Sequence, residues 1–416
     1  MKGGDERLEE GMSFSTACEH NALLHTSIVW YNTYMGFFSR YAQKKIFIAI
    51  DLGSHSIKTA IFEKPKTGLA PLNIKKTVTK LSAVFRGSRV FASLHDTLIE
   101  LFKTVPNPQK IVIGIGPNVA DISLQKWTID SLHFRETLTI AHIQKYFQQL
   151  FEEHREEGHV FFGYPVSIEI NGYPVDIHNF VLRDPSTVKE ITLRTIMLRF
   201  SDEAGSAFGE LRSMFSGVEI EYIPLQAVAA EVIASTHKIR NGLLIDVGGL
   251  VTTLMFIRDG WLDQVASFPI GTDRFSHRIM KTRGGKFVEA EDTRQQYAHG
   301  LLSEKEQIAL SHMFTEETEV WKKTFVTALE AYYPLAPLPQ DFYLYGGGSY
   351  LPEVRASLWA HDVIKGFSPF EAPRIHMIQA PQIFNNELLQ GAVEGAQDVG
   401  LAALMYYSLN HQHFFN

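Results

Sequence analysis

The stretch Ile46-Phe47-Ile48-Ala49-Ile50-Asp51-Leu52-Gly53-Ser54 decides the fold, because an apolar run ends there in an acidic residue that a glycine soon follows. A second strand-like run, Thr59-Ala60-Ile61-Phe62, comes shortly after it. Short apolar runs bounded by turn residues are typical of buried strands. The stretch therefore predicts a strand, a tight glycine turn and a returning strand, with a carboxylate at the turn.

The same unit occurs a second time. Leu243-Leu244-Ile245 leads into Asp246-Val247-Gly248-Gly249, and the run from Thr252 to Ile257 returns to a turn at Arg258-Asp259-Gly260. A third glycine turn, Gly346-Gly347-Gly348-Ser349, follows a strand-like run and precedes a helix-like segment. Two copies of one unit indicate two similar lobes, so the pattern predicts an α/β protein built from two halves.

These turns suit a nucleotide. Glycine turns at strand ends present backbone N–H groups to phosphate oxygens without side-chain bulk. If the lobes face each other, the carboxylates of Asp51 and Asp246 converge, which is unfavourable unless a cation lies between them. Mg²⁺ prefers oxygen ligands and retains water, so it fits between the carboxylates and the phosphates, and Lys58 adds a point charge. We therefore expect ATP and Mg²⁺ as the cofactors.

Other classes of protein are excluded by what the sequence lacks. There is no G-x-x-x-x-G-K-[ST] motif, and no G-x-G-x-x-G motif follows a strand. The chain has 39 Lys and Arg against 46 Asp and Glu, a net charge of -7, so nucleic acid is not an expected partner. Its single cysteine, Cys18, excludes a framework of intramolecular disulfides and fits a cytoplasmic location.

The motifs resemble the nucleotide signature shared by actin, sugar kinases and heat-shock chaperones. Residues 48–54 resemble its first phosphate motif, residues 244–249 its second, and residues 344–349 its adenosine motif. Within that superfamily the likeness is greatest to FtsA, a bacterial cell-division protein, and to PilM of type IV pilus assembly. Phe268-Pro269-Ile270-Gly271, Ala290-Glu291-Asp292-Thr293-Arg294 and Gly400-Leu401-Ala402-Ala403-Leu404 all look like FtsA sequence.

The resemblance implies the actin-like ATPase fold: two ribonuclease-H-like lobes, with a small α+β domain inserted in the first. We expect the first lobe over 45–118 and 223–242, and an inserted interaction domain over 119–222. The second lobe is expected over 243–275 and 336–410, with a helical subdomain over 276–335. Residues 1–44 are expected to form a disordered extension.

The residues and the resemblance together define a candidate site. Asp51 and Asp246 are expected to hold the metal and support catalysis, and Gln226 to position water. A helix over Glu289–Gln295 places Glu291 and Arg294 three positions apart on one face. The expected nucleotide contacts are Gly53, Ser54, His55, Ser56, Lys58, Gly248, Gly249, Thr252, Gly271, Glu291, Arg294, Gly346, Gly347, Gly348 and Ser349.

Two departures from the FtsA pattern bear on catalysis. Leu250 stands where the second phosphate motif has a glycine, and Thr253 stands where it has an aspartate. A side chain at 250 would crowd the loop or forbid a positive φ, and position 253 supplies no carboxylate. We therefore expect at most a weak Mg²⁺-dependent ATPase.

Three functions follow from the resemblance. The favoured one is an FtsA-like protein that self-associates into filaments or dimers and binds FtsZ-like or other division proteins. The alternative is a PilM-like adaptor with a pilus inner-membrane partner, and the third is a small-molecule kinase of the same superfamily. The last residues, 406–416, lack the basic helix by which FtsA reaches the membrane, so membrane contact is expected through residues 1–44 or a partner.

Overall fold

The computed structural model describes most of the chain from residue 45 onward. The described residues are 45–64, 74–80, 89–105, 108–130, 138–139, 142–143, 145–146, 149, 160–175, 181–182, 187–215, 217–331, 338–360, 363 and 373–410. The extension expected over 1–44 lies outside them. Among the described residues, no helix is long and apolar enough to cross a membrane.

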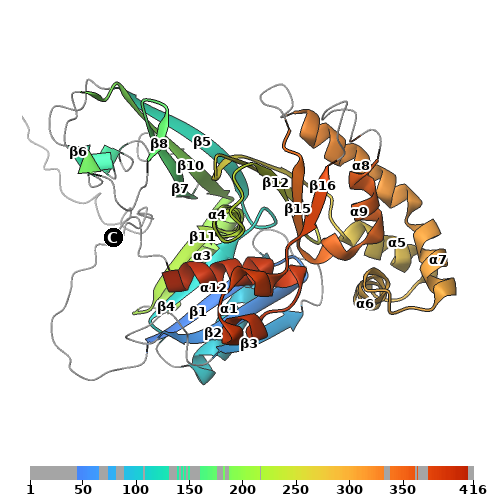
Figure 1. Ribbon diagram of the computed structural model, residues 1–416. Helices are drawn as coiled ribbons and strands as arrows, with labels where there is room; N and C mark the ends of the chain where they lie inside the picture. The colour runs from blue at the N-terminus through green and yellow to red at the C-terminus, as the bar shows by residue number, and fades with distance from the viewer. Residues whose placement is uncertain are drawn as a thin grey trace, which may run out of the picture.

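The first lobe is built on a five-stranded sheet (Figure 1). Its order is β11 (Glu219–Pro224), β4 (Lys110–Ile115), β1 (Lys45–Leu52), β2 (Ser56–Lys64) and β3 (Ile74–Lys80). The first three strands in the chain pair antiparallel, whereas β4 and β11 join β1 as parallel strands. The expected strand, turn and returning strand are therefore β1 and β2, and the central β1 is buried along most of its length.

The second lobe repeats this arrangement. Its sheet has the order β14 (Trp261–Phe268), β13 (Thr252–Arg258), β12 (Gly242–Val247), β15 (Asp341–Tyr345) and β16 (Arg374–Met377). Here too the first three strands are antiparallel and the last two are parallel to the first. Because both sheets place the strand that carries the acidic motif at the centre, the motifs occupy equivalent positions in the two lobes.

Two helices cross between the lobes and join them. Helix α4 (Leu225–Thr236) follows β11 of the first lobe and packs against β13 and β14 of the second. Helix α12 (Val399–Asn410) ends the second lobe and packs against β1, β2 and β4 of the first, and the two helices also pack on each other. Most of their residues are buried, and one hydrophobic core includes residues of both lobes. This exchange of helices holds the ends of β1 and β12 on the two sides of one space.

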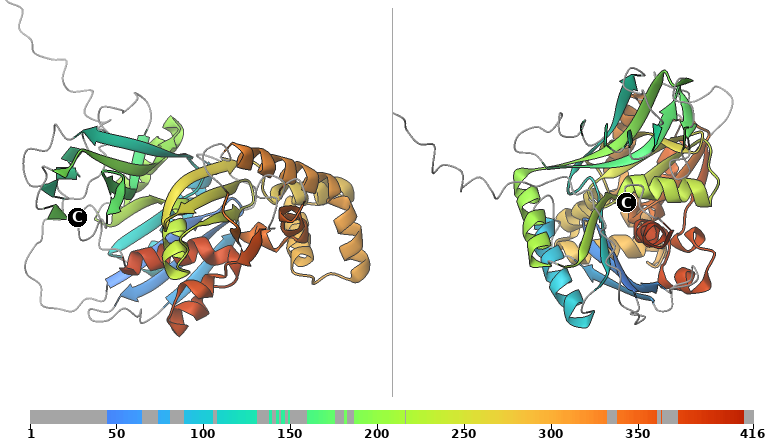
Figure 2. Two further views of the ribbon diagram at one scale, coloured as in Figure 1. Left: turned by 45° about the horizontal axis from the view of Figure 1, so that its top comes forward. Right: turned by 90° about the vertical axis from the view of Figure 1, so that its left-hand side faces the viewer.

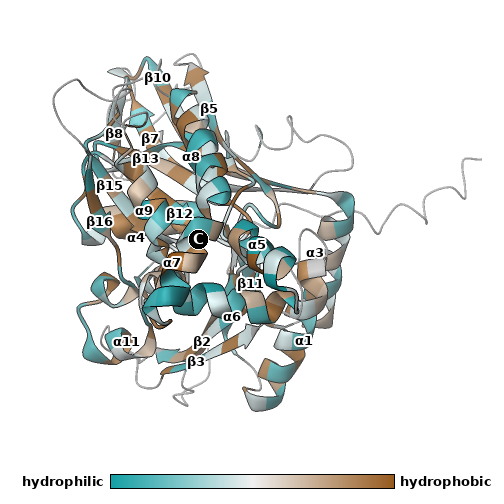
Figure 3. Cartoon of the chain, turned by 90° about the vertical axis from the view of Figure 1, so that its right-hand side faces the viewer, coloured by the Kyte–Doolittle hydropathy of each residue, from teal (hydrophilic) through white to brown (hydrophobic). Residues whose placement is uncertain are grey.

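The remaining helices cover the outer faces of the sheets. Helices α1 (Arg89–Thr104) and α3 (Asp202–Met214) share a core with the first sheet. On the second lobe stand α5 (Asp273–Arg283), α6 (Phe287–Ala298), α7 (Glu304–Met313), α8 (Thr315–Glu330) and α9 (Pro352–Leu358). Helix α7 projects from the lobe and has one buried residue, Leu310, among the residues that the structure describes. Most of its surface is accordingly hydrophilic (Figure 3). Short elements complete the lobe: η4 (Gly347–Tyr350), η5 (Ala380–Ile383), α11 (Glu387–Ala392) and η6 (Ala396–Asp398).

A four-stranded antiparallel sheet lies between β4 and α3 in the chain. Its order is β5 (Asp121–Asp130), β10 (Glu190–Phe200), β7 (Val160–Ile170) and β8 (Tyr173–Val175), with a separate pair of β6 (Leu138–Thr139) and β9 (Val181–Leu182). The turn from β7 to β8 has positive φ at Asn171 (52°) and Gly172 (81°), as a two-residue hairpin requires. Figures 1 and 2 place this inserted sheet at the opposite end of the molecule from α7. The sequence over 140–157 is helix-like, but most of that range lies outside the described residues.

The inserted sheet touches both lobes. Arg194 of β10 forms ion pairs with Glu169 of β7 and with Asp263 of β14, the edge strand of the second lobe. Arg258 adds a second cation at Asp263, at 3.2 Å. The hydroxyl of Tyr164 on β7 donates to Glu231 of α4, at 3.0 Å. The insert is therefore fixed to the second lobe by an ion pair and to α4 by a hydrogen bond.

Candidate nucleotide-binding site

A cavity of about 400 Å³ lies between the lobes, a size typical of ligand pockets. Its walls come from the β1–β2 turn, the β12–β13 turn, the start of α4, helix α6 and the segment before α12. The predicted site residues that line it are Asp51, Gly53, Ser54, His55, Ser56, Lys58, Gln226, Asp246, Gly248, Gly249, Glu291, Arg294, Gly346 and Gly347. Residues from both ends of the chain thus meet in one place.

The two acidic residues of the motifs share one electrostatic environment. Asp51 is 7% exposed, and its burial raises the pKa of its carboxyl group. The charge of Lys58 lowers this pKa and the charge of Asp398 raises it, and the net shift is upward. Burial and the charge of Asp51 raise the pKa of Asp246 to about 7, although Lys58 and a hydrogen bond from Gln226 lower it. The charge of Asp51 thus disfavours ionisation of Asp246. A divalent cation between them would remove this repulsion, so the donor set fits Mg²⁺.

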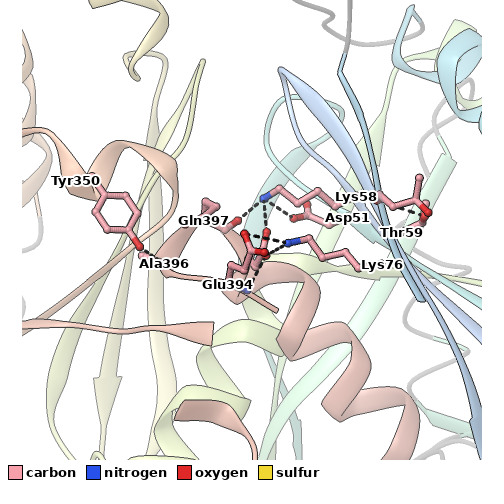
Figure 4. A network of polar contacts seen from close by, with 10 residues as sticks. Asp51, Lys58, Thr59, Lys76, Tyr350, Glu394, Ala396 and Gln397 are labelled. Atoms are coloured by element: carbon pink, nitrogen blue, oxygen red, sulfur yellow. Dashed lines mark hydrogen bonds and ion pairs between the residues drawn. The ribbon is translucent and has the colours of Figure 1, made fainter. Parts of the chain in front are cut away.

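Lys58 of β2 lies at the centre of a polar network that Figure 4 shows. Its Nζ is 3.7 Å from Asp51 Oδ2 and 3.7 Å from Asp398 Oδ1, and it donates to the carbonyl of Gln397. Lys76 of β3 pairs with the same Asp398, which is 1% exposed. Two lysines of the first lobe therefore meet a carboxylate of η6, the segment that leads from the second lobe into α12.

The glycines of the motifs allow backbones and side chains to approach closely. A Cβ on Gly249 would lie 2.4 Å from Ser54 Oγ, so the two turns touch across the cavity. Gly346 has φ of 85°, and a Cβ there would lie 2.5 Å from Asp246 Oδ1. At Gly347 the nearest atom to such a Cβ is 4.0 Å away, so this glycine faces open space in the cavity.

Helix α6 contributes a buried ion pair to the cavity wall. Arg294 Nε donates to Glu291 at 3.0 Å, and Ser276 Oγ donates to the same carboxylate at 2.6 Å. Burial alone would raise the pKa of Glu291, but the hydrogen bonds and charges of His55 and Arg294 outweigh it and hold the pKa well below its usual range. Arg294 Nη1 is buried and has no hydrogen-bond partner within the described part of the chain.

Gln226 stands at the first turn of α4 and is 3% exposed. Its side chain hydrogen-bonds Asp246, and its Oε1 has no partner among the described residues. An unpaired buried acceptor beside two carboxylates suits a bound water molecule. Gln226 therefore lines the cavity beside Asp246, and its role in positioning water stays a prediction.

Four of the predicted contacts lie behind the turns and do not line the cavity. The hydroxyl of Thr252 donates to the carbonyl of Ile270 at 2.7 Å and accepts from Trp321 at 3.1 Å. Ser349 Oγ donates to the carbonyl of Gly346 at 2.7 Å. A Cβ on Gly271 or Gly348 would lie within 2.4 Å of neighbouring protein atoms. These residues shape the turns and do not line the cavity, and their expected contact with the ligand stays a prediction.

The departures in the second motif have a structural explanation. Leu250 is 8% exposed and is not among the described residues with positive φ, so the turn adopts a conformation that a side chain tolerates. Thr253, 1% exposed, forms a hydrogen bond with Ser267 at 3.1 Å. Both residues line the cavity, so its wall has a leucine and a hydroxyl at these two positions.

Sequence reasoning missed several residues of the cavity: Lys76, Asn118, His299, Tyr350, Gln397 and Asp398. Most lie outside the three glycine turns, so the motifs gave no signal for them. Asp398 could have been suspected, because it stands two positions before the Gly400 of a recognised segment.

Comparisons with known proteins find the fold but no family. No protein-family model matches the chain, and no curated protein matches it. Among solved structures, a PilM–PilN type IV pilus biogenesis complex matches with a TM-score of 0.57 and 16% identity, over 86% of this chain and 97% of that one. EutJ, an ethanolamine utilization protein from Carboxydothermus hydrogenoformans, has a TM-score of 0.44 and 14% identity, over 88% and 91%. MreB5 of Spiroplasma citri bound to ADP has a TM-score of 0.41 and 11% identity, over 87% and 96%. With its duplicated sheets and exchanged helices, the chain has the actin-like ATPase fold, as its motifs predicted.

Proposed function

We propose that the protein binds Mg²⁺-ATP between its lobes and that the nucleotide-bound form binds a protein partner. The observation that carries this proposal is the position of Asp51 and Asp246, which lie beside facing glycine turns in one cavity. Two buried carboxylates with raised pKa values need a cation, and glycine turns favour phosphate.

Each residue has a role in this proposal. Asp51 and Asp246 would hold the Mg²⁺, whose chemistry is to offset phosphate charge. Lys58 moves its ammonium group from Asp398 toward the phosphate chain. Glu291 and Arg294 of α6, which line the cavity, would face the nucleoside part of the ligand. Binding thus draws residues of both lobes together, which is how a ligand shifts a two-lobed protein toward its closed state.

Hydrolysis is slow in this proposal. Gln226 hydrogen-bonds Asp246 and keeps an acceptor for water, but Thr253 supplies no carboxylate that could act as a base. Catalysis would therefore rest on positioning and on the metal. ATP serves mainly as a conformational ligand.

The partner we favour is a segment of a pilus inner-membrane assembly protein, bound at the inserted sheet. The likeness to a chain of the PilM–PilN type IV pilus biogenesis complex extends over 97% of that chain, which supports this choice over the division role favoured by the sequence. A division partner of the FtsZ type is the second candidate, because residues 171–175 and 346–351 resemble FtsA.

Thermal unfolding tests the nucleotide part. At ATP concentrations 100-fold above Kd, binding stabilises the folded state by about 2.7 kcal/mol, so Mg²⁺-ATP raises the Tm of the wild type. Asp51→Ala and Asp246→Ala remove the rise, with Gly391→Ala on the surface as a control that keeps it. Equal shifts in all variants contradict the assignment.

Copurification from the native host tests the partner. Recovery of pilus inner-membrane proteins, dependent on the inserted sheet, supports the pilus role. Recovery of an FtsZ-type protein in their place supports the division role. Phosphoryl transfer to a metabolite that Asp246→Ala abolishes would point instead to a small-molecule kinase.

A further inference from the structure

His55 joins the two lobes across the mouth of the cavity. It lies in the β1–β2 turn of the first lobe, and its Nε2 forms an ion pair with Asp273 at the start of α5 in the second. Its Nδ1 is 3.4 Å from Glu291 of α6, and its ring meets Phe287 edge to face at 5.5 Å. One side chain of the first phosphate turn thus contacts two helices of the opposite lobe.

Asp273 extends this contact to the second phosphate turn. Its backbone N–H donates to the carbonyl of Gly249 at 2.9 Å, which fixes the β12–β13 turn to α5. Its side chain is 7% exposed, and His55 is the only cation paired with it in the described part of the chain. Without a cation at position 55, a buried carboxylate would stand alone next to the closed turns, which is strongly unfavourable.

We infer that His55 is a positioning residue that, in its protonated form, holds the two phosphate turns together and so makes ATP affinity depend on pH. The inference rests on the proposed nucleotide function. His55 need not touch ATP, since it acts through Asp273 and the two turns.

The charged groups that face His55 support protonation. Asp273 of α5 and Glu291 of α6 both contact the ring of His55, and Arg294 donates to Glu291. Residues 248–251 of the second phosphate turn carry no charge. Burial opposes protonation, but the hydrogen bonds and charges of the two carboxylates prevail and raise the pKa of His55 to about 9.

The direction of the pH effect follows from this shift. If opening of the cleft returns His55 to water and to its ordinary value of about 6.5, closure takes up a proton. The stabilisation of the closed state is complete below pH 6.5 and is lost as the pH rises through 9. Between pH 8.0 and 9.5 these values give at most about an eightfold loss of ATP affinity. Asp246 has its pKa at about 7 and is largely ionised before this window begins.

The experiment measures the affinity for Mg²⁺-ATP at pH 8.0 and 9.5 with the full chain. In the wild type the affinity falls severalfold at the higher pH. His55→Gln binds ATP more weakly at pH 8.0 and shows no further fall, whereas His55→Lys keeps a cation and binds alike at both values. His277→Gln is the matched control. The ring of His277 also packs on Phe287, with the ring centroids 4.9 Å apart, but His277 does not line the cavity. This variant therefore keeps the wild-type fall in affinity.

The outcomes separate the inference from the proposed function. The role of His55 is overturned if the wild-type affinity for ATP does not change with pH. It is also overturned if the affinity of His55→Gln falls as much as that of the wild type. In both cases the proposal that the protein binds ATP is kept. Absence of ATP binding at every pH overturns the proposed function itself. If His55→Gln does not fold, the comparison of the wild type with His55→Lys decides the matter.

Discussion

Replacement of Gly249 by alanine tests whether the two phosphate turns must touch for ATP to bind. A Cβ at this position would lie 2.4 Å from Ser54 Oγ, 2.8 Å from His55 Cε1 and 2.8 Å from Asp273 Oδ1. Ordinary contact begins at 3.4 Å, so these side chains, or the turns that carry them, must shift by about 1 Å. Gly249 has no positive φ, so alanine strains no backbone and the two lobes can fold as before.

The expected effect is a penalty on closure. Forcing a methyl group into a packed contact costs about 1–3 kcal/mol, which corresponds to a loss of ATP affinity of about 5- to 150-fold. Titration calorimetry with Mg²⁺-ATP measures this loss, and circular dichroism checks that Gly249→Ala is folded. Gly209→Ala is the matched control, because a Cβ at this position on α3 meets no atom within 4 Å. Wild-type affinity in Gly249→Ala would refute the reasoning that the turns close over the phosphates.

Three further predictions concern the cavity, the core and the insert. Gly347→Trp fills the open side of the cavity and abolishes ATP binding with little change in the Tm of the free protein, as thermal unfolding with and without ATP will reveal. Thr252→Val leaves the buried Trp321 N–H without an acceptor and lowers the free energy of unfolding by about 1–3 kcal/mol, yet ATP affinity stays within twofold. Arg194→Asp breaks the ion pair between the insert and Asp263 and speeds amide hydrogen exchange in β14. Adding Asp263→Arg to the same chain restores an ion pair and slows the exchange again. Exchange that stays fast in the double variant would argue against that ion pair.

The sequence could predict those parts of the site that local pattern encodes. The strand ends at Asp51 and Asp246 were recognisable because an apolar run, a carboxylate and a glycine lie within a few positions. Their convergence followed from the duplicated unit, since two equivalent lobes that face each other bring equivalent strand ends together. The exchange of α4 and α12 is the packing that achieves this.

The parts that sequence could not predict depend on distant packing. The pair of Glu291 and Arg294 reads as a surface couple on an isolated helix, but α5 and the β1–β2 turn bury it. Lys76 and Asp398 lie at opposite ends of the chain, and only the fold makes them partners. Thr252 has the residue type of a phosphate ligand, yet its hydroxyl turns toward Trp321 and away from the cavity.

The most direct test of the account is a crystal structure of the protein with Mg²⁺ and a non-hydrolysable ATP analogue. The account predicts one metal ion between the carboxylates of Asp51 and Asp246, with the phosphates over the turns that contain Gly53 and Gly248. A nucleotide bound elsewhere, or a metal ion that neither carboxylate approaches directly or through water, would contradict it.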